Sequence, residues 1–164
     1  MHPAEELHIT KPLEPGHELA LALLLTRERL IRLMDERVFK PAGLTDSQFN
    51  VLRILKGGPA EGTTIGEIRR RIIVRSTDVP RLVDRLVRLG FVTRQQNQKD
   101  RRSCHVLLTE AGEACEAQVT PIHTAVLREL ETLLSTKDRN LLMELLERLR
   151  DGMGALIADS EDGI

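Results

Sequence analysis

The chain has 164 residues, close to the usual size of a single domain, and its formal net charge of −1 indicates no particular class of partner. Its aromatic residues are Phe39, Phe49 and Phe91 alone, with no Trp and no Tyr. This scarcity excludes modules that stack bases on exposed rings, such as RNA-recognition sheets and single-strand-binding barrels. A core of Leu and Ile favours a mainly α fold.

The number of cysteines and the length of the apolar runs exclude further classes of protein. Cys104 and Cys115 are too few for a disulfide scaffold or a zinc site with four thiolates. The first residues lack the basic region of a secretory signal, and the longest apolar run, Leu19–Leu25, is much shorter than the roughly 20 residues of a membrane span. We expect a soluble, cytoplasmic protein with no membrane contact, no metal and no cofactor.

Positive charge is concentrated in the middle of the chain. Residues 66–105 hold 11 basic and 4 acidic residues, whereas residues 106–164 hold 5 basic and 12 acidic ones. Ten of the eleven central cations are Arg. Such a block is typical of a surface that binds a polyanion, and a solvated helix face is the alternative.

The first third of the chain predicts a loose arm over residues 1–15 and a helix over residues 16–40, which Pro41-Ala42-Gly43 ends. Two capping boxes follow. Thr45 with Gln48 predicts the start of one helix, and Thr64 with Glu67 predicts the start of a second, shorter one.

The next segment predicts a helix over about residues 76–89, capped by Ser76 or Thr77 and ended by Gly90. Residues 91–94 and 104–108 read as two short strands. Thr109 and Ser135 then open two long helices, the first interrupted by Pro121, and residues 159–164 are expected to fray. The predicted organisation is a winged helix-turn-helix lobe over residues 44–109 and a helical dimerisation region over residues 16–40 and 110–158.

A short helix, a turn and a second helix with outward arginines form helix-turn-helix geometry, in which the second helix enters the major groove of DNA. Arg reads guanine through two hydrogen bonds, and Ser and Thr read bases or bind phosphate. Arg88 is assigned instead to an ion pair with Asp84, four residues earlier. The residues expected to contact DNA here are Arg75, Ser76, Thr77, Asp78, Arg81 and Arg85.

The polar segment between the two strands predicts a wing over about residues 94–104. A narrow minor groove attracts arginine, so we expect contacts from Arg94, Lys99, Arg101 and Arg102. Phosphate would repel Asp100, which is therefore assigned to orienting a neighbouring arginine. A plain solvated turn is the alternative.

These segments together resemble a family, the MarR-type winged-helix transcription regulators, over about Glu18 to Leu156. The resemblance is carried by Arg81–Leu86, Gly90–Val92, Asp100–Arg102 and Leu108–Gly112. It implies a nucleoid-associated homodimer on a palindromic operator, with interleaved first and last helices. It also implies a repressor or activator released by a small-molecule effector, bound in a mainly aliphatic pocket between the dimerisation helices and the lobe.

By family position, Arg81 is the recognition-helix arginine and Arg101 or Arg102 the wing arginine. Pro80 departs from the family pattern, and the first helix lacks the cysteine of peroxide-sensing members. Cys104 is interpreted as a small hydrophobic residue, and the neighbours Glu113 and Glu116 disfavour a thiolate at Cys115.

The leading hypothesis is a dimeric, sequence-specific DNA-binding regulator and not an enzyme. Apolar residues from Leu141 to Leu156, and those of the first helix, exceed what the lobe alone can cover, which favours a homodimer. Packing of these helices within one chain is the alternative. The competing function is a winged-helix adaptor that binds an acidic protein. No spacing of His, Cys, Ser or Asp supports a catalytic or metal site.

Overall fold

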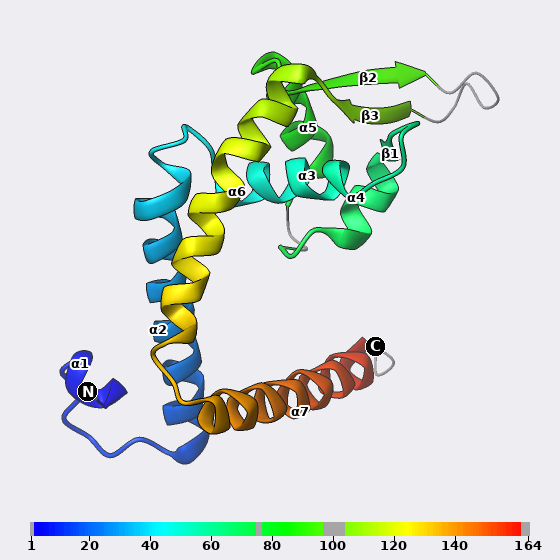
Figure 1. Ribbon diagram of the computed structural model, residues 1–164. Helices are drawn as coiled ribbons and strands as arrows, with labels where there is room; N and C mark the ends of the chain where they lie inside the picture. Colours follow the sequence, from blue (N-terminus) through cyan, green and yellow to red (C-terminus); the bar gives the residue numbers. More distant parts are fainter. Residues whose placement is uncertain (1, 75–76, 97–103, 162–164) are drawn as a thin grey trace. The chain divides into compact units, whose positions relative to one another are not determined.

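The computed structural model describes residues 2–74, 77–96 and 104–161 (Figure 1). The chain divides into two units, residues 1–124 and residues 125–164. The first unit contains the three-stranded sheet and most of the helices. The second contains the end of α6 (Glu110–Glu131) and all of α7 (Thr136–Glu161).

The predicted arm over residues 1–15 contains a short helix, α1 (Pro3–Glu6), which the sequence prediction missed. The His2 side chain caps it, and Nε2 of His2 lies 2.6 Å from Oε1 of Glu18. Glu6 forms a second ion pair with Arg29, at 2.8 Å. Both partners lie on α2 (Pro15–Met34), so two contacts tie α1 to that helix.

The helix predicted over residues 16–40 is α2 followed by a π-helical segment, η1 (Asp35–Phe39). The backbone N–H of Lys40 closes this wider turn on the carbonyl oxygen of Asp35 at 2.9 Å. Val38 and Phe39 are 1% exposed, so the wider turn coincides with the point where the helix enters the core. Gly43 follows with a φ of 67°, which confirms the predicted break.

Both predicted capping boxes are present. Thr45 opens α3 (Asp46–Lys56), where its Oγ1 accepts from the N–H of Gln48 and the Gln48 side chain accepts from the N–H of Thr45. Thr64 and Glu67 make the same reciprocal pair at the start of α4 (Ile65–Arg71). These bonds satisfy donors that the first turn of a helix leaves free, so local sequence sets both helix starts.

The sheet is antiparallel with the order β1-β3-β2. Strands β2 (Val92–Gln96) and β3 (Cys104–Leu108) form the predicted hairpin, with Val92 opposite Leu108. The third strand, β1 (Thr63–Thr64), has two residues and was not predicted, because so short a segment carries no alternation. It pairs Thr63 with Val106 and so places the start of α4 beside the hairpin.

Helix α5 (Val79–Arg88) packs with α3, α4 and the hairpin around one apolar core. The mainly α fold with a small β-hairpin is thus confirmed. Residues at most 2% exposed in this core are Phe49, Val51, Leu52, Ile68, Val79, Val83, Leu86, Val92 and Val106.

In the second unit, Ser135 caps α7 as predicted, accepting the N–H of Asp138 at 3.1 Å. The helix continues to Glu161, past the end predicted at residue 158. It leaves large apolar side chains exposed, including Leu141, Leu142, Met143, Leu145 and Leu156. No helix among the described residues is long and apolar enough to cross a membrane.

Candidate nucleic-acid interface

Helix α5 separates its apolar and basic residues cleanly. Val79, Val83 and Leu86 are completely buried on one face. Arg81, Arg85 and Arg88 are exposed on the other, and the side chain of Arg81 is 88% exposed. Spacings of three and four residues put the three arginines along one side of the helix. The helix therefore presents a row of guanidinium groups outward while its opposite face holds it in the core.

The N-terminus of α5 lies two residues later than predicted, and the prediction of Ser76 or Thr77 as its cap was wrong. Asp78 is the cap: its Oδ1 accepts the backbone N–H of Arg81 at 3.3 Å. Pro80 is the second helical residue, where its missing N–H costs no intrahelical bond. The sequence predicts Asp78 as a DNA contact. In the structure its carboxylate caps the N-terminus of α5.

Asp78 also holds the side chain of Arg81. Its Oδ2 lies 3.2 Å from Nε of Arg81, so the ion pair reaches the guanidinium through Nε. The backbone N–H of Thr77 bonds the carbonyl oxygen of Val74 at 3.1 Å, and its side chain is half-buried. Arg75 and Ser76 lie outside the described residues.

Arg94 on β2 pairs with Asp84 on α5, with Nη2 and Oδ1 2.8 Å apart. The predicted ion pair of Asp84 with Arg88 is thus replaced by one that joins the hairpin to the helix. Arg88 forms no ion pair with any other described residue. Arg94, predicted to contact DNA, has a protein partner. Sequence spacing could not show this pair, because it depends on how the hairpin folds back.

Hydrogen bonds join the hairpin to two neighbouring segments. Nδ1 of His105 lies 2.8 Å from the carbonyl oxygen of Glu61, in the loop before β1. Thr109 Oγ1 donates to the carbonyl oxygen of Gly90 at 2.6 Å and accepts the N–H of Gly112 at 3.1 Å. Gly90 has a φ of 76°, which confirms the left-handed end predicted for the preceding helix. These hydrogen bonds therefore hold the hairpin to the loop before β1 and to the residue that ends α5.

The predicted tip of the wing lies at residues 97–103, outside the described residues. The predictions for Lys99, Asp100, Arg101 and Arg102 remain predictions. The strands on either side are described, with Gln96 opposite Cys104. The hairpin thus leads toward the tip from a base that is joined to α5 by the Asp84–Arg94 pair.

The two cysteines have different surroundings. The Cys104 Sγ lies 3.8 Å from the carbonyl oxygen of His105 and is half-buried on β3. Burial, and then the charge of Glu116, raise the pKa of the Cys115 thiol. In the described part of the chain, no three His, Cys, Asp or Glu side chains form a group that could hold a metal ion.

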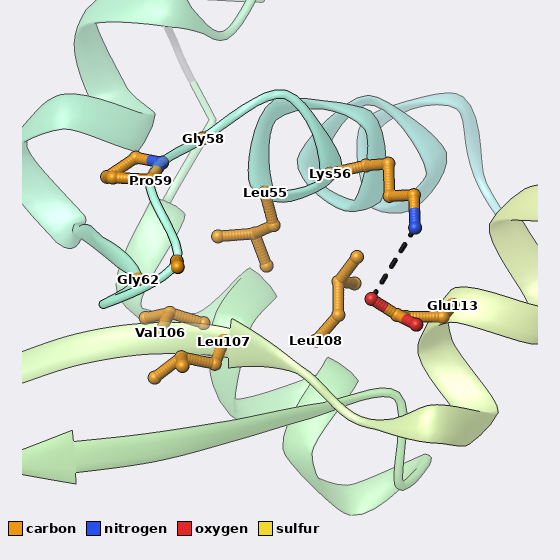
Figure 2. Close-up of a pocket in the computed structure, with 10 residues that line it drawn as sticks. Leu55, Lys56, Gly58, Pro59, Gly62, Val106, Leu107, Leu108 and Glu113 are labelled. Carbon is orange, nitrogen blue, oxygen red and sulfur yellow. Dashed lines mark hydrogen bonds and ion pairs between the residues drawn. The ribbon is translucent and has the colours of Figure 1, made fainter.

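A small pocket of about 180 Å³ lies beside the hairpin (Figure 2). The end of α3, the turn after it, β3 and the start of α6 supply its walls, which include Leu55, Pro59 and Leu108. Lys56 Nζ and Glu113 Oε1 face one another at 3.5 Å on one side of it. Ligand sites usually exceed about 300 Å³, so this pocket is too small for a typical effector.

Comparison with known proteins gives a consistent result. Residues 42–103 match the model of the MarR family. The chain is 32% identical to the uncharacterised HTH-type transcriptional regulator YkoM of Bacillus subtilis, over 80% of this chain and 86% of that protein. It is 25% identical to the transcriptional repressor MprA of Escherichia coli, over 87% and 82% of the two chains.

Among solved structures, the structure resembles that of a mutant MarR from Escherichia coli in complex with operator DNA. The TM-score is 0.68 and the sequences are 29% identical, over 80% of this chain and 92% of that one. The region that matches the family model, residues 42–103, includes α3, α4, α5 and strand β2 in the first unit.

Proposed function

Because the chain belongs to the MarR family of transcriptional regulators, we propose that it is a homodimeric, sequence-specific DNA-binding repressor. Helix α5 and the residues that precede it, about 76–89, enter the major groove. The wing, about 94–104, enters the adjacent minor groove. The observation that carries this proposal is the row of exposed arginines on α5 opposite a fully buried face.

Within α5, Arg81 is the base-reading residue in this proposal. It lies in the first turn of the helix, and residues near that end of a recognition helix reach the base edges. Asp78 holds Nε of Arg81, so the terminal nitrogens can take two hydrogen bonds to a guanine. Arg85 follows one turn later and is positioned to meet phosphate. A related MarR has been solved in complex with operator DNA, which supports DNA binding by this chain.

The wing contributes Lys99, Arg101 and Arg102 to the minor groove, with Asp100 orienting an adjacent arginine. This part of the proposal rests on the sequence and on the family resemblance. The described strands β2 and β3 support it as a hairpin that the Asp84–Arg94 pair joins to α5. Arg94 acts in the base of the wing, where its charge is shared with Asp84.

The homodimer is supported by apolar surface that is exposed in the single chain. Leu142 and Leu145 on α7 are 44% and 47% exposed, and Leu24 on α2 is 60% exposed. Exposed apolar patches of this kind mark interaction surfaces. A second copy of the chain would cover them and would place two α5 helices about 34 Å apart, one turn of DNA. Such a dimer fits a palindromic operator.

The name of MprA as a repressor supports the proposed sign of regulation. The release of DNA by a small-molecule effector is proposed from the family resemblance. A thermal-shift screen of small phenolic and anionic compounds, repeated in the presence of DNA, tests it. An effector should raise the melting temperature of the free protein and weaken DNA binding by the same linkage.

Salt titration tests the DNA-binding proposal against an adaptor that binds an acidic protein. The probe is the pool of duplexes that in vitro selection enriches from a randomised library. Binding through several phosphates per subunit should weaken steeply, with log K falling by about 0.9 per phosphate for each tenfold rise in salt. No selective enrichment, or no duplex binding at physiological salt, would contradict the proposal and favour the adaptor.

Two sets of variants test which residues of the interface determine sequence preference and which add affinity for any sequence. Arg81→Ala should reduce the ratio of selected to random duplex affinity, because base contacts specify sequence. Arg101→Ala combined with Arg102→Ala should weaken both duplexes by a similar factor. Equal, sequence-independent losses from both sets would overturn this assignment. Sedimentation at micromolar concentration tests the homodimer, and a monomer there would refute it.

A further inference from the structure

Three consecutive arginines close helix α4. Arg69, Arg70 and Arg71 form its last turn, and all three are exposed. Ile68, which precedes them in the helix, is completely buried in the core. None of the three forms an ion pair with another described residue. The helix thus carries three positive charges on its outer surface and an apolar anchor beneath them.

The one acidic residue of α4 is occupied elsewhere. Oε2 of Glu67 accepts the backbone N–H of Thr64 at 2.9 Å and the Thr64 hydroxyl at 2.8 Å. These hydrogen bonds, and then the charges of Arg70 and Arg71, lower the pKa of Glu67. Its carboxylate is therefore ionised and held at the N-terminal end of the helix. It caps α4 and makes no direct pair with the arginines.

The arginines lie where α4 turns toward α5. The connection from Ile72 to Asp78 is short, and the backbone bond from Thr77 to Val74 tightens it. The side chain of Asn50, on α3, accepts the N–H of Ile73 at 3.3 Å and holds the start of this connection. Helices α4 and α5 also pack against one another. The last turn of α4 therefore leads directly to the N-terminus of α5, the end that reads bases in the proposed function.

Helix stability alone does not account for three arginines here. Cations near a helix C-terminus are favoured by its dipole, which is worth about 0.3–1 kcal/mol at exposed sites. Successive residues point about 100° apart, however, so the three side chains spread widely around the outer surface. In a helix-turn-helix module the first helix crosses the DNA backbone. Exposed guanidinium groups in the last turn of α4 could therefore bind phosphates of the DNA backbone.

We propose that Arg69, Arg70 and Arg71 form a phosphate-binding site for the DNA backbone, beside the groove that α5 enters. This site rests on the proposed function and extends it, because the residues lie outside the set predicted from the sequence. Phosphate contacts set register and affinity but carry little sequence information. The site should therefore add strength and salt dependence to binding without changing which sequences are preferred.

The test compares the full-length protein with a variant in which Arg69, Arg70 and Arg71 are changed to Gln. The probes are one duplex from the selected pool and one random duplex of equal length, each titrated from 50 to about 300 mM salt. If each subunit loses at least one phosphate contact, the slope of log K against log salt should fall in magnitude by about 2 per dimer. The ratio of the two affinities should stay within about twofold of the wild-type ratio.

Two further variants keep the result interpretable. Changing the same residues to Lys keeps the charge and should restore the slope to within about 1 of wild type. Changing Lys11, Arg53 and Lys56 to Gln removes three exposed charges outside the dimerisation helices and the proposed DNA contacts, and should leave the slope unchanged. The Gln variant must retain its circular dichroism spectrum. If it does not fold, the Lys variant is compared with single Arg70→Gln, for which the slope should still fall.

The outcomes separate this inference from the proposed function. If wild-type protein binds no duplex, the proposed function itself fails. If wild type binds and the folded Gln variant keeps the wild-type slope, the phosphate site alone is refuted. An equal fall in slope for the control variant would also refute it, because the effect would then be one of net charge. A changed sequence preference would overturn the assignment to phosphate.

Discussion

The carboxylate of Asp84 and the guanidinium of Arg94 meet at 2.8 Å and join α5 to strand β2 of the wing. Both side chains are partly exposed, so the pair is worth at most about 1 kcal/mol. The pair joins the helix and the hairpin that the proposed interface uses together. Arg94 is in this respect a positioning residue.

This pair predicts a double-mutant result. Asp84→Asn and Arg94→Gln should each weaken DNA binding by up to about fivefold, and the double variant should lose little more than either single one. The slope of log K against log salt should change little, since the pair is internal. If Arg94 binds phosphate instead, Arg94→Gln would lower the slope and Asp84→Asn would leave binding unchanged or stronger.

The cap of α5 gives a prediction about stability. Asp78→Ala removes the acceptor for the Arg81 N–H and should lower the free energy of unfolding by about 1 kcal/mol. Asp78→Asn and Asp78→Ser retain a capping oxygen and should recover most of this loss. Urea denaturation measures each value. A full loss in Asp78→Ser would show that the carboxylate acts through its charge on Arg81 rather than as a cap.

Two glycines in helices predict opposite effects of the same substitution. A Cβ at Gly112 would overlap the carbonyl oxygen of Phe91, which is backbone and has little room to move. Gly112→Ala should therefore destabilise the protein by more than about 1 kcal/mol, despite the higher helix propensity of Ala. A Cβ at Gly66 would meet no other atom within 4 Å. Gly66→Ala should therefore raise the free energy of unfolding by about 0.4–1 kcal/mol. Thermal unfolding compares the two, and a neutral Gly112→Ala would contradict the close approach.

His123 predicts a component of stability that depends on pH. Its ring lies 5.3 Å from that of Phe49 and 6.3 Å from that of Phe39. Burial, and then Arg53, lower the pKa of His123 below its usual value of 6.5, and Asp46 partly opposes them. The unfolded chain therefore takes up this proton more readily than the folded one. The contribution of neutral His123 to the free energy of unfolding should be fully present above pH 6.5 and should decrease as the pH drops below that value.

His123→Phe keeps the aromatic contacts and removes the titrating group. The free energy of unfolding of this variant should depend less on pH between 7.5 and 5 than that of wild type. Identical profiles for wild type and His123→Phe would contradict the assignment.

Local sequence was sufficient for the helix boundaries that depend on neighbouring residues. The two Thr capping boxes, the left-handed Gly90 and the Ser135 cap are contacts over one to four residues, so their spacing can be read directly. The exposed arginines of α5 follow from the same helical period that buries Val83 and Leu86. These features, together with the family resemblance, were enough to predict the fold class and the helix that carries the exposed arginines.

Contacts between distant segments could be found in the tertiary structure alone. Asp84 could have paired with Arg88 one turn away, and the return of the hairpin gave it Arg94 instead. The two-residue strand β1 exists because β3 offers it a partner, and α1 is held by Glu18 and Arg29 on α2. Hydrogen bonds and ion pairs of this kind depend on where separate elements pack, whereas caps and helical periods depend on the order of residues along the chain.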